Sequence, residues 1–79
     1  MSQNDAIAEV RSIVDDIEAL YAGQEAELDR LRDEDGDVPS ENLYEWDRLR
    51  YDVHGEQDAD MLGEVRRRLR GLIESQAAA

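Results

Sequence analysis

The feature that most constrains this chain is a stripe of apolar residues that are spaced alternately three and four positions apart over its first third. The stripe consists of Ile7, Val10, Val14, Ile17, Tyr21, Leu28 and Leu31, with Gln24 in the one polar place. Residues on one face of an α-helix recur with this spacing, whereas a half-buried strand alternates with period two. We therefore expect one long helix from about residue 4 to residue 32, with Ser2 or Asn4 as its cap.

A single apolar stripe cannot bury itself, so this helix needs a partner. The spacing is also that of a coiled-coil seam, and one expectation is a homodimer joined through Ile7, Val10, Val14, Ile17, Tyr21, Leu28 and Leu31. Gln24, next to Gly23, either marks the close approach of another backbone or weakens the seam locally.

The clearest break in the pattern is the acidic run of residues 33–39, which contains Gly36 and ends at Pro39. Beyond it we expect a helix over about 41–53 and a helix over about 58–75. Leu62, Leu69 and Ile73 belong to the apolar stripe of the last segment. Gly55 separates the two segments as a turn or as a kink, so residues 41–75 form either one helix or two.

These elements predict an all-α fold in a single acidic helical domain that covers residues 1–79. The arrangement is either an antiparallel helical hairpin or a small three-helix bundle. In the antiparallel arrangement the acids of the first helix lie near the arginines of the last helix. Pairing between them would fix the relative direction of the two helices. The acids are Glu9, Asp15, Asp16 and Glu18, and the arginines are Arg66, Arg67, Arg68 and Arg70.

Length and composition restrict the means of stabilisation. A chain of 79 residues without cysteine has neither disulfides nor thiolate zinc cages, so regular helix packing or a second copy must stabilise it. No stretch is apolar enough to span a membrane, and the first residues lack the pattern of a signal peptide. We expect no membrane association and a cytoplasmic location, in the host cell if a virus encodes the protein.

The sequence offers little for catalysis. It has no Cys and no Lys, and His54 is the only side chain that titrates near neutral pH. The flanking Gly55 places His54 in an exposed turn, so we expect no enzyme activity. Residues 33–37 look like part of an EF-hand loop, but that register puts Leu31 and Asn42 where Asp and Glu are required. We expect no metal and no cofactor.

The formal net charge of -12 is concentrated in the middle of the chain, where residues 25–60 carry 14 acids and 4 Arg. Such a surface repels phosphate, which argues against direct nucleic-acid binding. It can instead imitate a nucleic-acid backbone and bind a basic, nucleic-acid-binding protein. The residues expected to bind this partner are Glu25, Glu27, Asp29, Asp33, Glu34, Asp35, Asp37, Glu41, Tyr44, Glu45, Trp46 and Asp47.

In size, charge and helicity the chain resembles small phage-encoded and mobile-element proteins, among them inhibitors of CRISPR effector complexes and DNA mimics. That resemblance implies an inhibitor or adaptor that acts through a protein partner. The alternative is a structural coiled-coil oligomerisation module, whose acidity reflects only solvation or adaptation to salt. In that alternative a concentration-dependent dimer is expected.

Overall fold

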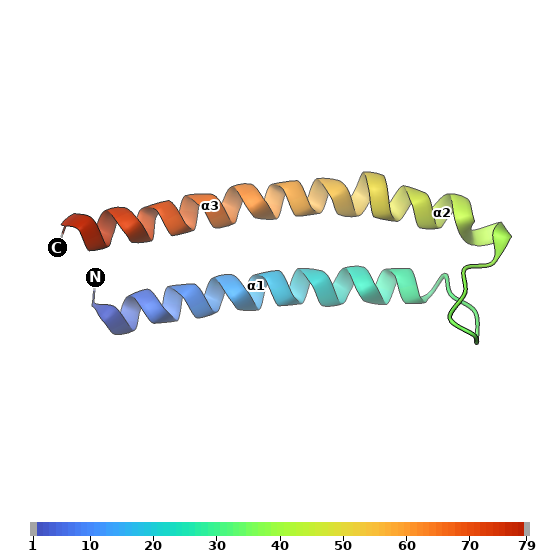
Figure 1. Ribbon diagram of the computed structural model, residues 1–79, viewed down its shortest axis with the longest axis horizontal. Helices are drawn as coiled ribbons and strands as arrows, with labels where there is room; N and C mark the ends of the chain where they lie inside the picture. The colour runs from blue at the N-terminus through green and yellow to red at the C-terminus, as the bar shows by residue number, and fades with distance from the viewer. Residues whose placement is uncertain (1, 79) are drawn as a thin grey trace.

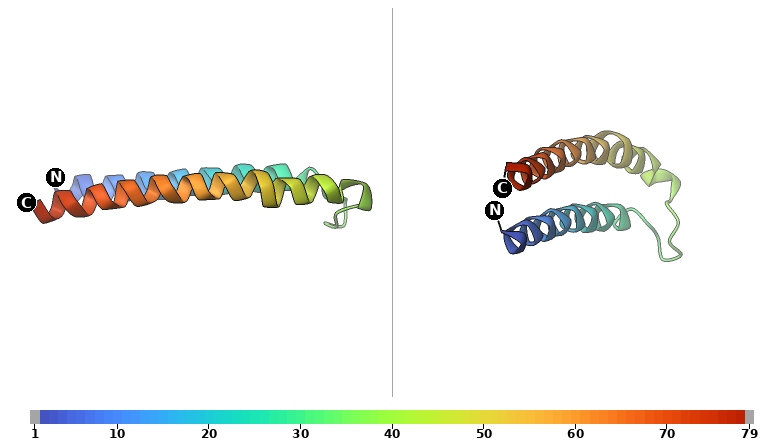
Figure 2. Two further views of the ribbon diagram at one scale, coloured as in Figure 1. Left: turned by 90° about the horizontal axis from the view of Figure 1, so that it is seen from above. Right: turned by 60° about the vertical axis from the view of Figure 1, so that its left-hand side comes forward.

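The computed structural model describes residues 2–78 and consists of two long helical arms joined by a turn (Figure 1). The first arm is α1, Gln3–Asp29. The second arm contains η1 (Ser40–Asn42), α2 (Leu43–Asp47), η2 (Arg48–Val53) and α3 (His54–Ala78). The arms lie side by side and run in opposite directions, so the start of α1 and the end of α3 lie at the same end of the molecule (Figures 1 and 2). Over the described residues the chain has no strand, and the all-α prediction is confirmed.

Local contacts set the bounds of α1. The Ser2 hydroxyl accepts a hydrogen bond from the Asp5 amide at 3.2 Å, and the Asp5 carboxylate accepts one from the Ser2 amide. This capping box satisfies backbone donors that the first turn leaves without a helical partner. At the other end, the amides of Leu31 and Arg32 bond three residues back, to Leu28 and Asp29. The tightened turn ends the helix at Asp29, before the acidic run.

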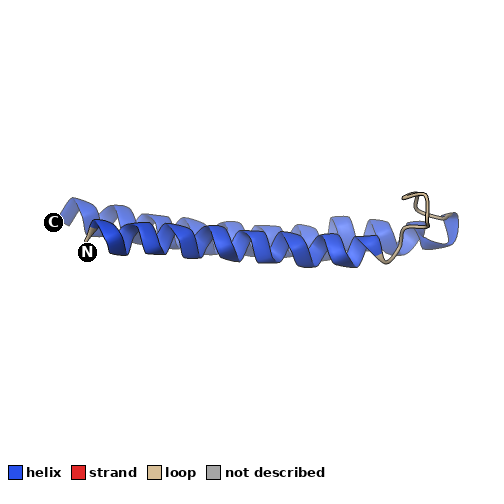
Figure 3. Cartoon of the chain, turned by 90° about the horizontal axis from the view of Figure 1, so that it is seen from below, coloured by secondary structure: helices blue, strands red, loops and turns tan. Residues whose placement is uncertain are grey.

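The second arm is helical without a break from Ser40 to Ala78, and the loop is confined to the end where the arms join (Figure 3). It changes pitch at η2, which is a π-helix. A π-turn holds more residues than an α-turn, so residues five apart come onto one face. Leu49 and His54 are five apart, and both are buried. The prediction that His54 lies in an exposed turn is therefore wrong, because Gly55 lies inside a continuous helix.

The arms form a single layer of helices with a thin core. The Cα atoms span 57 × 21 × 10 Å, and their radius of gyration is 17.5 Å, whereas a compact chain of this length would have about 12 Å. Among residues 2–77 the buried apolar side chains are Ile13, Leu28, Leu49 and Leu72. Domains usually bury their apolar faces between two layers, and this chain supplies one. None of the helices within residues 2–78 is long and apolar enough to cross a membrane.

Polar contacts fix the register between the arms. Arg68 donates to Glu9 at 2.6 Å, to Asp16 at 2.7 Å and to Ser12 at 2.9 Å. The predicted pairing between acids of the first helix and arginines of the last is confirmed for Arg68. These charged hydrogen bonds raise the pKa of Arg68, with Glu9 as the main cause.

Candidate functional site

The end of the molecule where the arms join, residues 29–47, is called the tip here. Its loop is organised by Asp33, whose carboxylate accepts hydrogen bonds from the amides of Asp35 at 2.9 Å and Asp37 at 3.0 Å. The backbone reverses at Gly36, whose φ of 87° favours glycine. The Asp33 amide donates to the Asp37 carbonyl at 2.7 Å and closes the loop. Asp33 therefore shapes the tip from within, while Asp35 and Asp37 remain exposed.

Trp46 is half-buried and contacts Arg32, just beyond the end of the first arm. The Arg32 guanidinium lies over its ring, 4.8 Å from the centroid, and Arg32 also pairs with Asp29 at 3.3 Å. Cation–π stacking of this kind holds a planar side chain against a charged one. Asn42 adds a hydrogen bond to the Leu31 carbonyl at 3.0 Å. These contacts join the start of the second arm to the end of the first.

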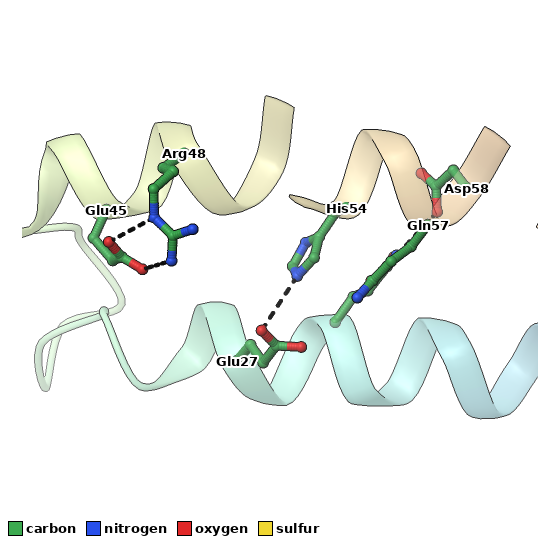
Figure 4. Close-up of polar contacts among 7 residues, drawn as sticks. Glu27, Glu45, Arg48, His54, Gln57 and Asp58 are labelled. Atoms are coloured by element: carbon green, nitrogen blue, oxygen red, sulfur yellow. Dashed lines mark hydrogen bonds and ion pairs between the residues drawn. The ribbon is translucent and has the colours of Figure 1, made fainter. Parts of the chain in front are cut away.

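Glu45 is bound by Arg48, one helical turn further on (Figure 4). The Arg48 Nε atom donates to Glu45 Oε2 at 3.0 Å, and Arg48 Nη2 contacts the other carboxylate oxygen. The hydrogen bond from Arg48 lowers the pKa of Glu45, and the same bond raises the pKa of Arg48. Glu45 is thus held in its charged form and already has a cationic partner.

The structure divides the predicted partner-binding residues into two groups. Asp29, Asp33, Glu45 and Trp46 make contacts within the tip, and Glu27 lies between the arms near His54. The remaining acids are exposed, with no ion pair to any residue from 2 to 78; they are Glu25, Glu34, Asp35, Asp37, Glu41 and Asp47. Tyr44 is 81% exposed at the same end of the molecule. Glu25 lies on α1 outside the tip, and the other five carboxylates with Tyr44 are called the tip surface.

Polar side chains from both arms meet in a layer between the arms (Figure 4). The sequence patterns did not predict this layer. Gln24 is buried and donates to Gln57 at 3.1 Å and to Asp58 at 3.0 Å. His54 is 5% exposed, and its Nε2 atom lies 3.7 Å from Glu27 Oε2. Gln24 bonds to side chains, and a Cβ added at the neighbouring Gly23 would meet no atom within 4 Å, so the layer does not match the interpretation of close approach by another backbone.

A second surface lies along the remainder of the arms, which are called the stem. Eight large apolar side chains are between 40% and 68% exposed there: Ile7, Val10, Val14, Ile17 and Tyr21 on α1, and Leu62, Leu69 and Ile73 on α3. The first five belong to the predicted oligomer seam. Leu28 and Leu31 of that seam lie elsewhere, since Leu28 is buried against the second arm and Leu31 is half-buried.

The exposed apolar residues of both helices lie on the same side of the arm pair. On α1, Val14 directly follows the buried Ile13, and Tyr21 directly follows the half-buried Leu20. Successive residues of a helix are about 100° apart around its axis. On α3, Leu69 and Ile73 likewise follow Arg68 and Leu72, which face α1. Because the helices face each other and run in opposite directions, the same rotation brings both sets to one side. This set of eight is called the stem face.

Within residues 2–78 no three His, Cys, Asp or Glu residues are grouped so that they could hold a metal ion. No protein-family model, curated protein or solved structure matches the chain. The tip surface and the stem face are the two surfaces of the described chain that can bind a partner.

Proposed function

We propose that the protein is an inhibitor or adaptor that binds a basic, nucleic-acid-binding protein through the tip surface. The observation that carries the proposal is that five exposed carboxylates, without ion pairs to the described residues 2–78, gather at one end of an elongated molecule. Negative groups displayed along a narrow end can enter a positively charged groove that would otherwise hold a phosphate backbone. Tyr44 supplies an exposed aromatic side chain of the kind that anchors protein interfaces.

The tip contacts support this role because they hold the loop in one shape before binding. Asp33, Gly36 and the Arg32–Trp46 stack fix the backbone that carries Glu34, Asp35 and Asp37. A preformed binding surface loses less conformational entropy when it associates.

The test is capture of partners from a nuclease-treated lysate on the immobilised chain, followed by elution with excess double-stranded DNA. The proposal expects a basic nucleic-acid-binding protein that DNA displaces. A variant with Glu34, Asp35, Asp37 and Glu41 all changed to Lys should lose this protein. Recovery of the same protein by the tip variant contradicts the proposal.

A matched control reverses four exposed acids of the stem, Asp15, Asp60, Glu64 and Glu74, and so changes the net charge by the same amount. This control should retain the captured protein, because screening confines the effect of an exposed charge to about 8 Å at physiological salt. Equal loss with both variants would show that total charge, rather than the tip, governs capture. Circular dichroism of both variants checks that the helix content is unchanged.

A second candidate function is favoured by the stem face. In this proposal the protein is a structural module that joins copies of itself through the stem, and its acidity keeps the assembly soluble. This second candidate is supported by the exposure of the predicted seam residues on α1 from Ile7 to Tyr21. Lysate capture that yields only copies of this chain, or a partner insensitive to DNA, would favour the second candidate over the first.

A further inference from the structure

The stem face leaves the chain with more exposed surface than a stable monomer of its size normally has. The chain exposes 6004 Å², whereas a compact monomer of 9.0 kDa exposes about 4,900 Å². Within residues 2–78 neither side of the arm pair has a second layer, and the exposed large apolar side chains of both stem helices lie on the stem face.

We propose that the stem face binds a second copy of this chain about a two-fold axis near Val14, with the two tips at opposite ends of the dimer. This inference deepens the second candidate function and rests on it. It does not depend on what the tip binds, because the stem face and the tip surface share no residue.

The spacing of the stem face is that of a self-complementary surface. On α1 the exposed set runs from Ile7 to Tyr21 and is centred on Val14, and on α3 it runs from Leu62 to Ile73 and is centred between residues 67 and 68. In two antiparallel helices, the numbers of facing residues have a nearly constant sum. That sum is 80 for Ser12 and Arg68, 81 for Glu27 and His54, and 82 for Gln24 and Asp58. Position 14 thus lies across from positions 66 to 68, and one two-fold axis serves both helices.

On α1, the charges beside the stem face also fit a second copy. Arg11 and Glu18 are exposed on α1 and have no ion pair with any residue from 2 to 78. They lie on the outer margin of the stem face, at nearly equal distances on either side of Val14. When α1 faces its own copy in the opposite direction, Arg11 of each chain meets Glu18 of the other. The pair therefore forms twice.

The distribution of charge selects the orientation. The segments that carry the stem face are nearly balanced, since residues 1–24 have a net charge of -4 and residues 61–79 have +2. Residues 25–60 carry -10. With the tips together, two such segments would lie within a few screening lengths of each other. With the tips at opposite ends, each acidic segment extends beyond the other chain.

The area of the stem face matches the area that each chain buries in a stable dimer. The stem of α1 is about 40 Å long, and two neighbouring helices are about 20 Å wide, which gives a face of about 800 Å². Specific interfaces bury about 800 Å² on each partner. Val14, Ile17, Tyr21 and Ala22 also line a shallow depression that a large side chain of the facing helix can fill.

Sedimentation of the full-length protein over a range of concentrations tests the self-association. We expect a dimer whose population falls on dilution. Val14→Asp should raise its dissociation constant on the order of 100-fold, because each dimer would bury two unpaired charges. Ala19→Asp adds the same charge on the far side of α1 and should change the constant less than about threefold. A concentration-independent monomer overturns the proposal and leaves the stem face for another protein's helices.

Single cysteines test the orientation without depending on a destabilising variant, because the natural chain has no cysteine. Val14→Cys should form a covalent dimer with a short thiol cross-linker, since the two copies of residue 14 lie beside the axis. Glu34→Cys at the tip and Ala19→Cys on the far side should stay monomeric on a denaturing gel. Cross-linking at residue 34 but not at residue 14 overturns the orientation while the second candidate function stands. A sedimenting dimer in which neither residue 14 nor residue 34 cross-links also overturns it.

Discussion

The tip and the stem of this molecule differ in the range of the contacts that shape them. In the tip loop, Asp33 bonds to residues two and four positions away, and Glu45 is bound by Arg48 three positions away. In the stem, Gln24 contacts a residue 34 positions away, and Arg68 contacts one 59 positions away. A tip with local contacts can hold its shape through a few side chains. A stem with distant contacts depends on how the two arms meet.

The largest expected difference concerns apolar burial. Ile13→Ala in the stem should lower the free energy of unfolding by about 2–4 kcal/mol, because Ile13 is 4% exposed and its removal leaves a cavity between the arms. Leu43→Ala in the tip should cost less than about 1 kcal/mol, since Leu43 is 47% exposed. Urea unfolding followed by circular dichroism, at one protein concentration, measures both. Equal losses would contradict the distinction between stem and tip.

Two glycines should respond with opposite signs. Gly36→Ala in the tip should destabilise by about 1–2 kcal/mol, because φ at this position is 87°. Gly71→Ala lies inside α3, where an added Cβ meets no atom within 4 Å, and should stabilise by about 0.5–1 kcal/mol. The same unfolding experiment compares them. A stabilising Gly36→Ala would mean that the loop adopts another backbone conformation.

The smallest expected effect is the pH dependence of the tip. The hydrogen bond from Arg48 lowers the pKa of Glu45 in the folded chain, so its contribution to stability is present above the unfolded pKa. This contribution is lost as the pH falls through the lower folded pKa. An NMR titration of Glu45 should show its pKa move upward in Arg48→Gln. An unchanged pKa in that variant would show that the pair does not form in solution.

The sequence patterns predicted the features that depend on neighbouring residues. The three-and-four spacing gave a helical first third, Ser2 was one of its two expected caps, and the run that ends at Pro39 contains the turn. The antiparallel direction predicted pairing between four acids of the first helix and four arginines of the last, and among these Glu9 and Asp16 pair with Arg68. Each of these depends on short-range hydrogen bonding, on backbone preference or on the sign of a charge.

The patterns did not predict which apolar residues are buried. Ile13 and Leu28 lie between the arms, while Val14 and Tyr21, one helical step away from that contact, are exposed. An amphipathic stripe gives the direction of the apolar side of a helix, but the contact with α3 lies at one edge of that side. The burial of His54 was missed for a related reason, because the π-helix η2 brings it onto the face of Leu49.

The sequence by itself therefore determined that this protein is all-α and acidic, with its charge concentrated around an acidic turn. Helix periodicity, capping and charge are properties of nearby residues, so they can be read along the chain. Only the tertiary structure decided that the apolar stripe is divided between a thin interior and an exposed stem face, and that Trp46 lies against the Arg32 guanidinium at the end of the first arm. Those outcomes depend on the rotation of one arm against the other and on the closure of the loop. Both are set by contacts between the arms and across the turn.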